Sequence, residues 1–209
     1  MTYTDASIEE QSLDQTQPPA IEPEASPSQP ATAHGSSLFR EIVETLLLTV
    51  IIFVLVNAIT GRFRIDGSSM EPNLHDGEYV IVNRVVYRLQ APQRGDVVVF
   101  QRDGKREFIK RIIGLPGETV EVKGNQVIVN GAALNEPYIA QPNAYSMEPR
   151  RVGPNEYFVL GDNRNNSSDS HNWGTIPLSA LDGKAWITYW PPENWGIVPH
   201  YSYAQAQAP

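Results

Sequence analysis

The pattern of hydrophobic and polar positions divides the chain into three parts. Residues 1–38 are rich in Pro, Ser, Gln and acidic side chains, with no Lys or Arg before Arg40. This segment has too little apolar surface to offset the entropy of ordering, so it is predicted to be a disordered acidic tail. Residues 41–61 are strongly apolar, and residues 62–209 alternate in short runs separated by turn formers.

The apolar part predicts a single transmembrane helix over residues 41–61. Residues 42–60 read IVETLLLTVIIFVLVNAIT, which falls in the range of roughly 17–25 residues that spans a bilayer core. The alternative is a buried helix of a soluble core, but the run over residues 46–56 lacks a polar face. Arg40 precedes the segment and Arg62 and Arg64 follow it, so flanking charge weakly favours a cytoplasmic C-terminal domain.

The third part predicts a mainly β domain with an antiparallel sheet or barrel-like arrangement behind the helix. The expected strands are residues 78–82, 96–100, 119–122, 127–129, 157–160 and 185–190. A hairpin is expected at residues 123–126 and a turn at 130–131. Only residues 85–90 suggest a short helix. The unpaired edges of so many short strands must be kept from pairing with other chains, which favours a closed or sandwich-like domain.

Composition argues against several classes of function. The net charge of −8 and the absence of a basic stripe argue against nucleic-acid binding. The chain has no cysteine, which excludes thiol catalysis, disulfides and cysteine-based zinc sites.

Two segments after the apolar stretch carry candidate chemistry. Ser69 follows Gly67 in a turn that Met70 and Leu74 can anchor, and its backbone N–H could contribute to an oxyanion hole. Lys110 shares a strand face with Phe108, so burial would lower its pKa from about 10.4. A shift of two to three units costs on the order of 3–4 kcal/mol and would make the amine a usable general base. Taken singly, the serine could be an ordinary turn residue and the lysine an exposed strand residue.

A third segment, residues 161–174, is dense in turn formers and contains two carboxylates and an arginine. It could be a solvated loop. It could also form a self-bonded polar network in which Ser167 or Ser168 orients a neutral lysine amine.

The motifs together resemble those of the type I signal peptidases, membrane-anchored Ser/Lys endopeptidases that remove signal peptides. The matching motifs are Ser69-Met70-x-Pro72, Arg94-Gly95-Asp96-Val97-Val98, Lys110 through Gly117, and Gly161-Asp162-Asn163-Arg164 through Ser167 to Asp169. They occur in the family's order, and the likeness extends from the apolar segment to about Pro177.

The resemblance implies a role for individual residues. Ser69 matches the nucleophile, Lys110 the general base and Ser167 the hydroxyl that holds the lysine amine. Residues implied to brace the site are Asp162, Arg164, Asp169 and Arg111. Residues implied to form shallow apolar pockets for small side chains, as in an Ala-x-Ala cleavage site, are Ile65, Met70, Leu74, Phe108 and Ile109.

Three positions depart from the family pattern. Gly67 stands where many members have an oxyanion-binding serine, so that contribution is either absent or supplied by backbone or water. The expected oxyanion residues are Ser69 and Gly67. Asn73 replaces the usual threonine, which puts a local hydrogen bond in doubt. His171 stands where an arginine often pairs with the equivalent of Asp169, which suggests a weaker or pH-sensitive brace.

The resemblance implies cleavage after small residues without a metal or cofactor. The expected partners are signal peptides of pre-proteins and the lipid bilayer, and the expected state is monomeric. The location would be the bacterial plasma membrane, or an internal membrane such as the thylakoid. The catalytic domain would be extracytoplasmic, opposite to the weak indication of the flanking charges.

Four other functions are open to test. A Ser/His/Asp hydrolase would use Ser69, His171 and Asp162 or Asp169. A metal site could use the same two carboxylates and His171. A membrane-tethered β domain could bind exported chains without cutting them. A self-cleaving Ser/Lys repressor would need a DNA-binding module, which the acidic N-terminal segment does not offer.

Overall fold

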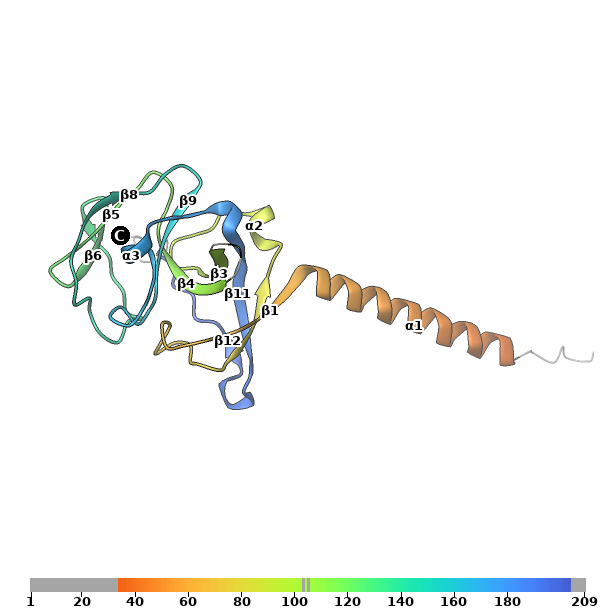
Figure 1. Ribbon diagram of the computed structural model, residues 1–209. Coiled ribbons are helices and arrows are strands. Elements are labelled where there is room, and N and C mark those ends of the chain that lie inside the picture. Colours follow the sequence, from red (N-terminus) through yellow and green to blue (C-terminus); the bar gives the residue numbers. More distant parts are fainter. Residues whose placement is uncertain (1–33, 103, 105, 204–209) are drawn as a thin grey trace, which may run out of the picture. The chain divides into compact units, whose positions relative to one another are not determined.

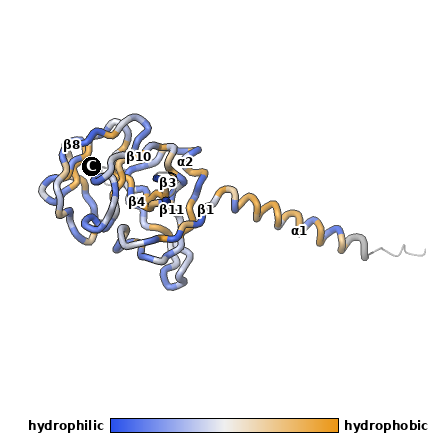
Figure 2. Tube along the Cα trace, in the orientation of Figure 1, coloured by the Kyte–Doolittle hydropathy of each residue, from blue (hydrophilic) through white to orange (hydrophobic). Residues whose placement is uncertain are grey.

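The N-terminal part of the described chain is one long apolar helix. The computed structural model describes residues 34–102, 104 and 106–203. Helix α1 (His34–Ile59) has 26 residues, and its stretch Leu38–Ile59 is long and apolar enough to cross a membrane. Figure 2 shows the hydrophobic residues that run along this helix. Its large apolar side chains are exposed, as a lipid-facing helix requires.

The helix boundaries differ from those expected at both ends. It begins at His34, inside the segment for which disorder was predicted; the rest of that prediction, residues 1–33, lies outside the described residues. It ends at Ile59 because Thr60 and Gly61 pair with Asn83 and Val82 as the start of a strand. Glycine also disfavours continuation of a helix.

The larger of two antiparallel sheets in the described chain has eight strands. Its order is β1-β2-β11-β3-β4-β9-β10, with β12 paired to β11. Strands β1, β11, β3, β4 and β9 of this sheet can be found in Figure 1. The strands are β1 (Thr60–Arg64), β2 (Tyr79–Asn83), β3 (Val97–Arg102), β4 (Arg106–Gly114), β9 (Glu156–Leu160), β10 (Ile176–Pro177), β11 (Leu181–Trp190) and β12 (Gly196–Ile197).

The smaller sheet has four strands in the order β7-β6-β5-β8. They are β5 (Thr119–Lys123), β6 (Gln126–Val129), β7 (Ala132–Ala133) and β8 (Met147–Arg151). Short helices connect the strands: α2 (Val86–Leu89), α3 (Ser170–Trp173) and the 3-10 helices η1 (Leu178–Ala180) and η2 (Pro192–Asn194). The mainly antiparallel β domain predicted from the sequence is confirmed.

Local chemistry explains the predicted elements. The hairpin between β5 and β6 turns at Gly124 and Asn125, whose φ angles of 58° and 68° lie in the left-handed region that these residue types tolerate. The strands that the sequence missed, among them β7, β8, β10 and β12, are short or lack an alternating pattern. Pairing with a neighbour, rather than their own sequence, defines them.

Strand β4 lies between two parts of the core and so positions the site. Ile109 packs with Val97 and Val99 in one buried cluster. Phe108 and Ile112 face the other way, into a second cluster. This is the alternation expected of a strand, and it places Lys110 on the Phe108 side.

Candidate active site

Ser69 lies in a turn that is anchored in the core. Met70 and Leu74 are buried at 0% and 2% exposure, in the same cluster as Ile65. Leu74 N–H donates to Met70 O at 3.1 Å. The turn starts at Gly67, whose φ of +92° favours glycine. The anchored turn holds a half-buried serine in a fixed place.

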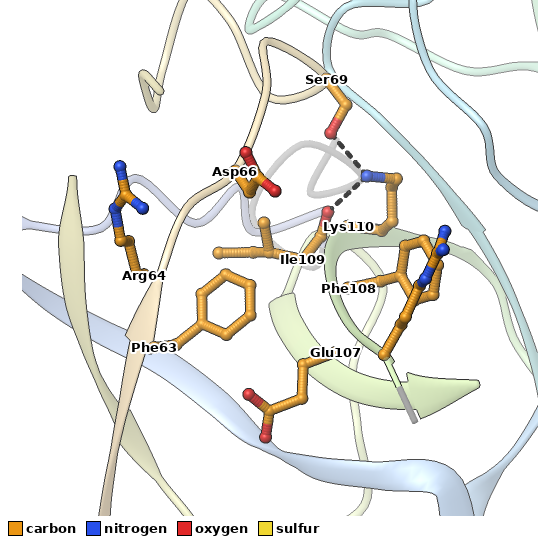
Figure 3. Close-up of a pocket in the computed structure, with 9 residues that line it drawn as sticks. Phe63, Arg64, Asp66, Ser69, Glu107, Phe108, Ile109 and Lys110 are labelled. Atoms are coloured by element: carbon orange, nitrogen blue, oxygen red, sulfur yellow. Dashed lines mark hydrogen bonds between the residues drawn. The ribbon is translucent and has the colours of Figure 1, made fainter. Parts of the chain in front are cut away.

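Lys110 meets Ser69 from β4. Its Nζ lies 2.6 Å from Ser69 Oγ and donates to Ile109 O at 2.8 Å (Figure 3). Lys110 is only 3% exposed. Burial lowers its pKa from 10.5 to about 8, although the nearby carboxylates Asp169 and Asp162 act in the opposite direction. About one-tenth of the amine is therefore neutral at pH 7, and the amine contacts the hydroxyl directly.

A cavity of about 520 Å³ opens beside this pair. Its lining residues are Phe63, Arg64, Asp66, Ser69, Arg106, Glu107, Phe108, Ile109 and Lys110. Figure 3 shows Ser69 and Lys110 at one side of it, with Phe63 and Ile109 toward its middle. The cavity thus places an apolar wall next to the hydroxyl and the amine.

The five residues expected to form substrate pockets fall into two groups. Phe108 and Ile109 line the cavity. Ile65, Met70 and Leu74 are buried in the core cluster that also contains Ile109. The structure therefore places these three behind the cavity wall, where they fix its shape, and their contact with substrate stays a prediction.

Asp162 and Arg111 form a buried ion pair beneath the turn. Arg111 Nε and Nη2 donate to the two Asp162 oxygens at 2.8 and 2.7 Å, and both side chains are 0% exposed. Asn73, which stands in place of the usual threonine, donates from Nδ2 to Asp162 Oδ2 at 2.8 Å. The pair thereby ties β4 to the Ser69 turn.

Two residues that the sequence analysis did not single out complete this network. The Tyr138 ring lies 4.1 Å from the Arg111 guanidinium, a cation–π contact within a desolvated site. Glu136 accepts two hydrogen bonds of 2.6 Å from Arg164, and the role of Arg164 in bracing the site stays a prediction. Nothing near Glu136 in the sequence marks it, because its partner is far along the chain.

Asp169 and His171 are paired, and the weaker or pH-sensitive character expected of this pair stays a prediction. His171 Nδ1 lies 2.6 Å from Asp169 Oδ1, and the imidazole stacks on Tyr145 at 4.1 Å between ring centroids. The other Asp169 oxygen accepts from Gly161 N–H at 2.9 Å. Asp169 therefore orders the start of the loop that follows β9.

The expected hydrogen bond between Ser167 and Lys110 is not formed. Among the described residues, Ser167 Oγ is buried and has no hydrogen-bond partner. The Lys110 amine is instead held by Ser69 Oγ and Ile109 O. Ser167 still lies close to the turn, since Ser167 Oγ and Ser69 O are both packed against Gly161. A Cβ added to Gly161 would lie 2.3 Å from Ser167 Oγ and 2.5 Å from Ser69 O.

The rival assignments find less support in this geometry. The titratable side chain in contact with Ser69 Oγ is Lys110, whereas the His171 Nδ1 atom is paired with Asp169. Asp162 is fully engaged by Arg111 and Asn73. Within the part of the chain that the structure describes, no group of three His, Cys, Asp or Glu side chains could hold a metal.

The oxyanion candidates differ in availability. Gly67 N–H donates to Asp76 Oδ1 at 2.7 Å and is therefore engaged. Ser69 N–H donates no hydrogen bond within the described residues. Of the two, Ser69 N–H is the backbone donor that a bound carbonyl oxygen could use.

Comparison with known proteins gives a consistent result. Residues 38–190 match the family described as signal peptidase, peptidase S26. A probable signal peptidase I-2 of Synechocystis sp. is 42% identical over 166 residues, 76% of this chain and 76% of the relative. Signal peptidase I of Leptolyngbya laminosa is 39% identical over 186 residues, 83% of this chain and 92% of the relative. Thylakoidal processing peptidase 1 of Arabidopsis thaliana is 34% identical over 165 residues, 73% of this chain and 48% of the relative.

Proposed function

The chain belongs to the signal peptidase family, peptidase S26, and we propose that it cleaves signal peptides from pre-proteins with Ser69 as nucleophile and Lys110 as general base. The observation that carries this assignment is the 2.6 Å approach of a buried lysine amine to a serine hydroxyl. A lysine whose pKa is lowered to about 8 by burial supports the role of base.

The substrate binds beside Ser69 as an extended segment. Residues 106–110 of β4 pair with β3 on one side, while the pairing with β9 starts only at Arg111. This leaves backbone groups of β4 along the cavity for an added strand, a common way to bind an extended peptide. The apolar wall made by Phe63, Phe108 and Ile109 suits the small apolar side chains that precede the scissile bond.

Acylation starts with neutral Lys110. Nζ takes the proton from Ser69 Oγ as Oγ bonds to the carbonyl carbon, and the carbonyl electron pair moves to the oxygen. Ser69 N–H stabilises this oxyanion. The intermediate collapses when the C–N bond breaks, and Lys110 returns the proton to the leaving amine. The products of this half-reaction are the free mature chain and a Ser69 ester.

Deacylation uses the same base. Lys110 Nζ takes a proton from a water molecule, the hydroxyl attacks the ester carbon, and Ser69 Oγ leaves with that proton. The ion pair between Arg111 and Asp162 holds β4 and the turn in register during both steps.

The protein is a membrane protein, and we place its catalytic domain on the extracytoplasmic side. Pre-proteins present their cleavage sites there, and a thylakoidal relative favours an internal membrane as a second location. In intact spheroplasts, added protease should digest a C-terminal tag. Protection of the tag there, with digestion in inside-out vesicles, would refute this placement. We expect the active unit to be a monomer, which the mass of the detergent-solubilised peptidase tests.

Cleavage of a purified pre-protein in detergent tests the proposed function. The wild type should cut after the second small residue of an Ala-x-Ala site, whereas Ser69→Ala and Lys110→Ala should be inactive. Lys123→Ala, which removes an exposed lysine at the end of β5, is the matched control and should stay active. Unchanged cleavage by Ser69→Ala would refute the dyad, and binding without cleavage by the wild type would favour a tethered binding domain.

A further inference from the structure

The turn that carries Ser69 is held by the loop that follows β9. Asn163 Nδ2 donates to Ser68 O at 3.1 Å, and Asn163 N–H donates to Ser69 O at 3.0 Å. Asn166 Nδ2 donates to Ser68 Oγ at 2.8 Å. One residue, Asn163, thus binds the carbonyl of the nucleophile and the carbonyl before it.

The hydrogen bond to Ser68 O fixes the direction of the next N–H. The peptide bond between Ser68 and Ser69 is trans, as the cis bonds of the described chain lie at Pro72 and Pro191. In a trans peptide the C=O and N–H groups point in opposite directions. Because Asn163 holds the Ser68 carbonyl toward the loop, Ser69 N–H points away from the loop. Ser69 N–H itself donates no hydrogen bond within the described residues.

This backbone donor matters more here than in a site with a side-chain donor. Gly67 has no side chain to offer, and its own N–H is bound by Asp76. Gly67 has no Cβ that would restrict its backbone, and its φ is +92°. The orientation of the neighbouring peptide planes therefore depends on their hydrogen bonds. Ser68 O has a second donor, Glu71 N–H, at the longer distance of 3.2 Å.

We propose that Asn163 is a positioning residue whose side chain, by holding the Ser68 carbonyl, aims Ser69 N–H at the oxyanion of the tetrahedral intermediate. The inference rests on the proposed role of Ser69 as nucleophile. Loss of a whole oxyanion donor costs about 10²–10³ in kcat. Loss of its alignment should cost less, because the Asn163 N–H and the Glu71 N–H still hold the turn.

Substitution of Asn163 by alanine removes the side-chain bond and keeps the backbone bond. With a pre-protein substrate, kcat of Asn163→Ala should fall about 10- to 100-fold, while KM changes less than about twofold. The pH midpoint of kcat/KM should stay that of the wild type, because Lys110 is untouched. Asn165→Ala is the control: its side chain bonds Pro142 O and Ala144 N–H rather than the turn, and it should cleave like the wild type.

A peptide aldehyde tests the oxyanion itself. Ser69 Oγ bonds to the aldehyde carbon, the C=O electron pair moves to oxygen, and the Oγ proton passes to Lys110 Nζ, which gives a tetrahedral adduct. The inhibition constant of the peptide aldehyde should be higher for Asn163→Ala than for the wild type. The factor should equal the factor by which kcat/KM of this variant falls. A purely structural defect would lower the active fraction without this proportionality.

The outcomes separate the inference from the proposed function. Unchanged cleavage by Ser69→Ala would overturn both. An inactive Ser69→Ala with a fully active Asn163→Ala, or a loss shared equally by Asn165→Ala, would overturn only the role of Asn163. If Asn163→Ala does not fold, Asn163→Asp keeps the side-chain shape without the N–H donor. At a pH above the pKa of Lys110, kcat of Asn163→Asp should fall at least as far as the 10- to 100-fold expected for Asn163→Ala. A wild-type kcat in Asn163→Asp would refute the inference.

Discussion

The pH dependence of cleavage is a direct test of the buried lysine. Raising the pH from 7 to 9 is expected to increase kcat/KM about tenfold, because in the proposed mechanism only neutral Lys110 can accept the Ser69 proton. Burial lowers the pKa of Lys110 to about 8, and the carboxylates of Asp169 and Asp162 limit the shift. Such an amine is about one-tenth neutral at pH 7 and about nine-tenths neutral at pH 9.

An ordinary lysine would behave differently. With a pKa of 10.5, the neutral fraction would rise about a hundredfold over the same interval, and the rate would keep rising beyond pH 10. Titration of nearby tyrosines does not obscure this range, because burial raises the pKa of Tyr138 and Tyr145 above their usual value of 10.0.

The assay is initial-rate cleavage between pH 6 and 10 by the full chain in detergent. The pre-protein should carry no ionisable side chain near its cleavage site, and Lys110→Ala gives the background. Thermal melting at each pH confirms that the enzyme stays folded. A flat profile, or a midpoint near 10, would refute the assignment of Lys110 as a desolvated base.

The same shift makes a prediction about stability. Because the unfolded chain binds the Lys110 proton more tightly, this lysine lowers the free energy of unfolding below pH 8. Its contribution should recover as the pH rises from about 8 to 10.5, by roughly 3 kcal/mol. Lys110 thus opposes folding at the pH where its lowered pKa would serve the proposed role as general base.

Three further predictions concern the surroundings of the site. Gly161→Ala should lower kcat at least about tenfold, because the new Cβ would lie 2.5 Å from Ser69 O and displace the turn; wild-type cleavage kinetics would contradict this. Asp162→Ala should lower the free energy of unfolding by about 3–5 kcal/mol, since it leaves the Arg111 charge buried and unpaired; denaturant titration measures the loss. Burial lowers the pKa of His200 from 6.5 to about 4. The contribution of His200 to the free energy of unfolding should therefore fall by roughly 3 kcal/mol as the pH drops from 6.5 to 4. The variant His200→Gln should lose less stability than the wild type over that interval.

The sequence itself determined the parts of this protein that depend on local pattern and residue type. The apolar run around residues 46–56 is sufficient to specify a long helix. Alternation and turn formers gave most of the longer strands and the hairpin at Gly124 and Asn125. The spacing within β4 also placed Lys110 on the Phe108 side, since side chains alternate along any strand.

Only the tertiary structure decided which distant residues meet. Glu136 reaches Arg164, and the Tyr138 ring covers Arg111, through contacts that no local pattern records. The carbonyl of Pro199 accepts from Arg111 at 3.0 Å, although this residue lies beyond the matched family segment that ends at residue 190.

The structure also decided the details of the proposed catalytic pair. The side chain of Lys110 selects Ile109 O and Ser69 Oγ as partners rather than Ser167. That choice depends on ångström-scale differences between a turn and a strand 41 residues apart. Residue types and spacing state which groups can react, but the burial that lowers the lysine pKa and the hydrogen bonds that orient Ser69 exist only once the sheet and the loops have packed together.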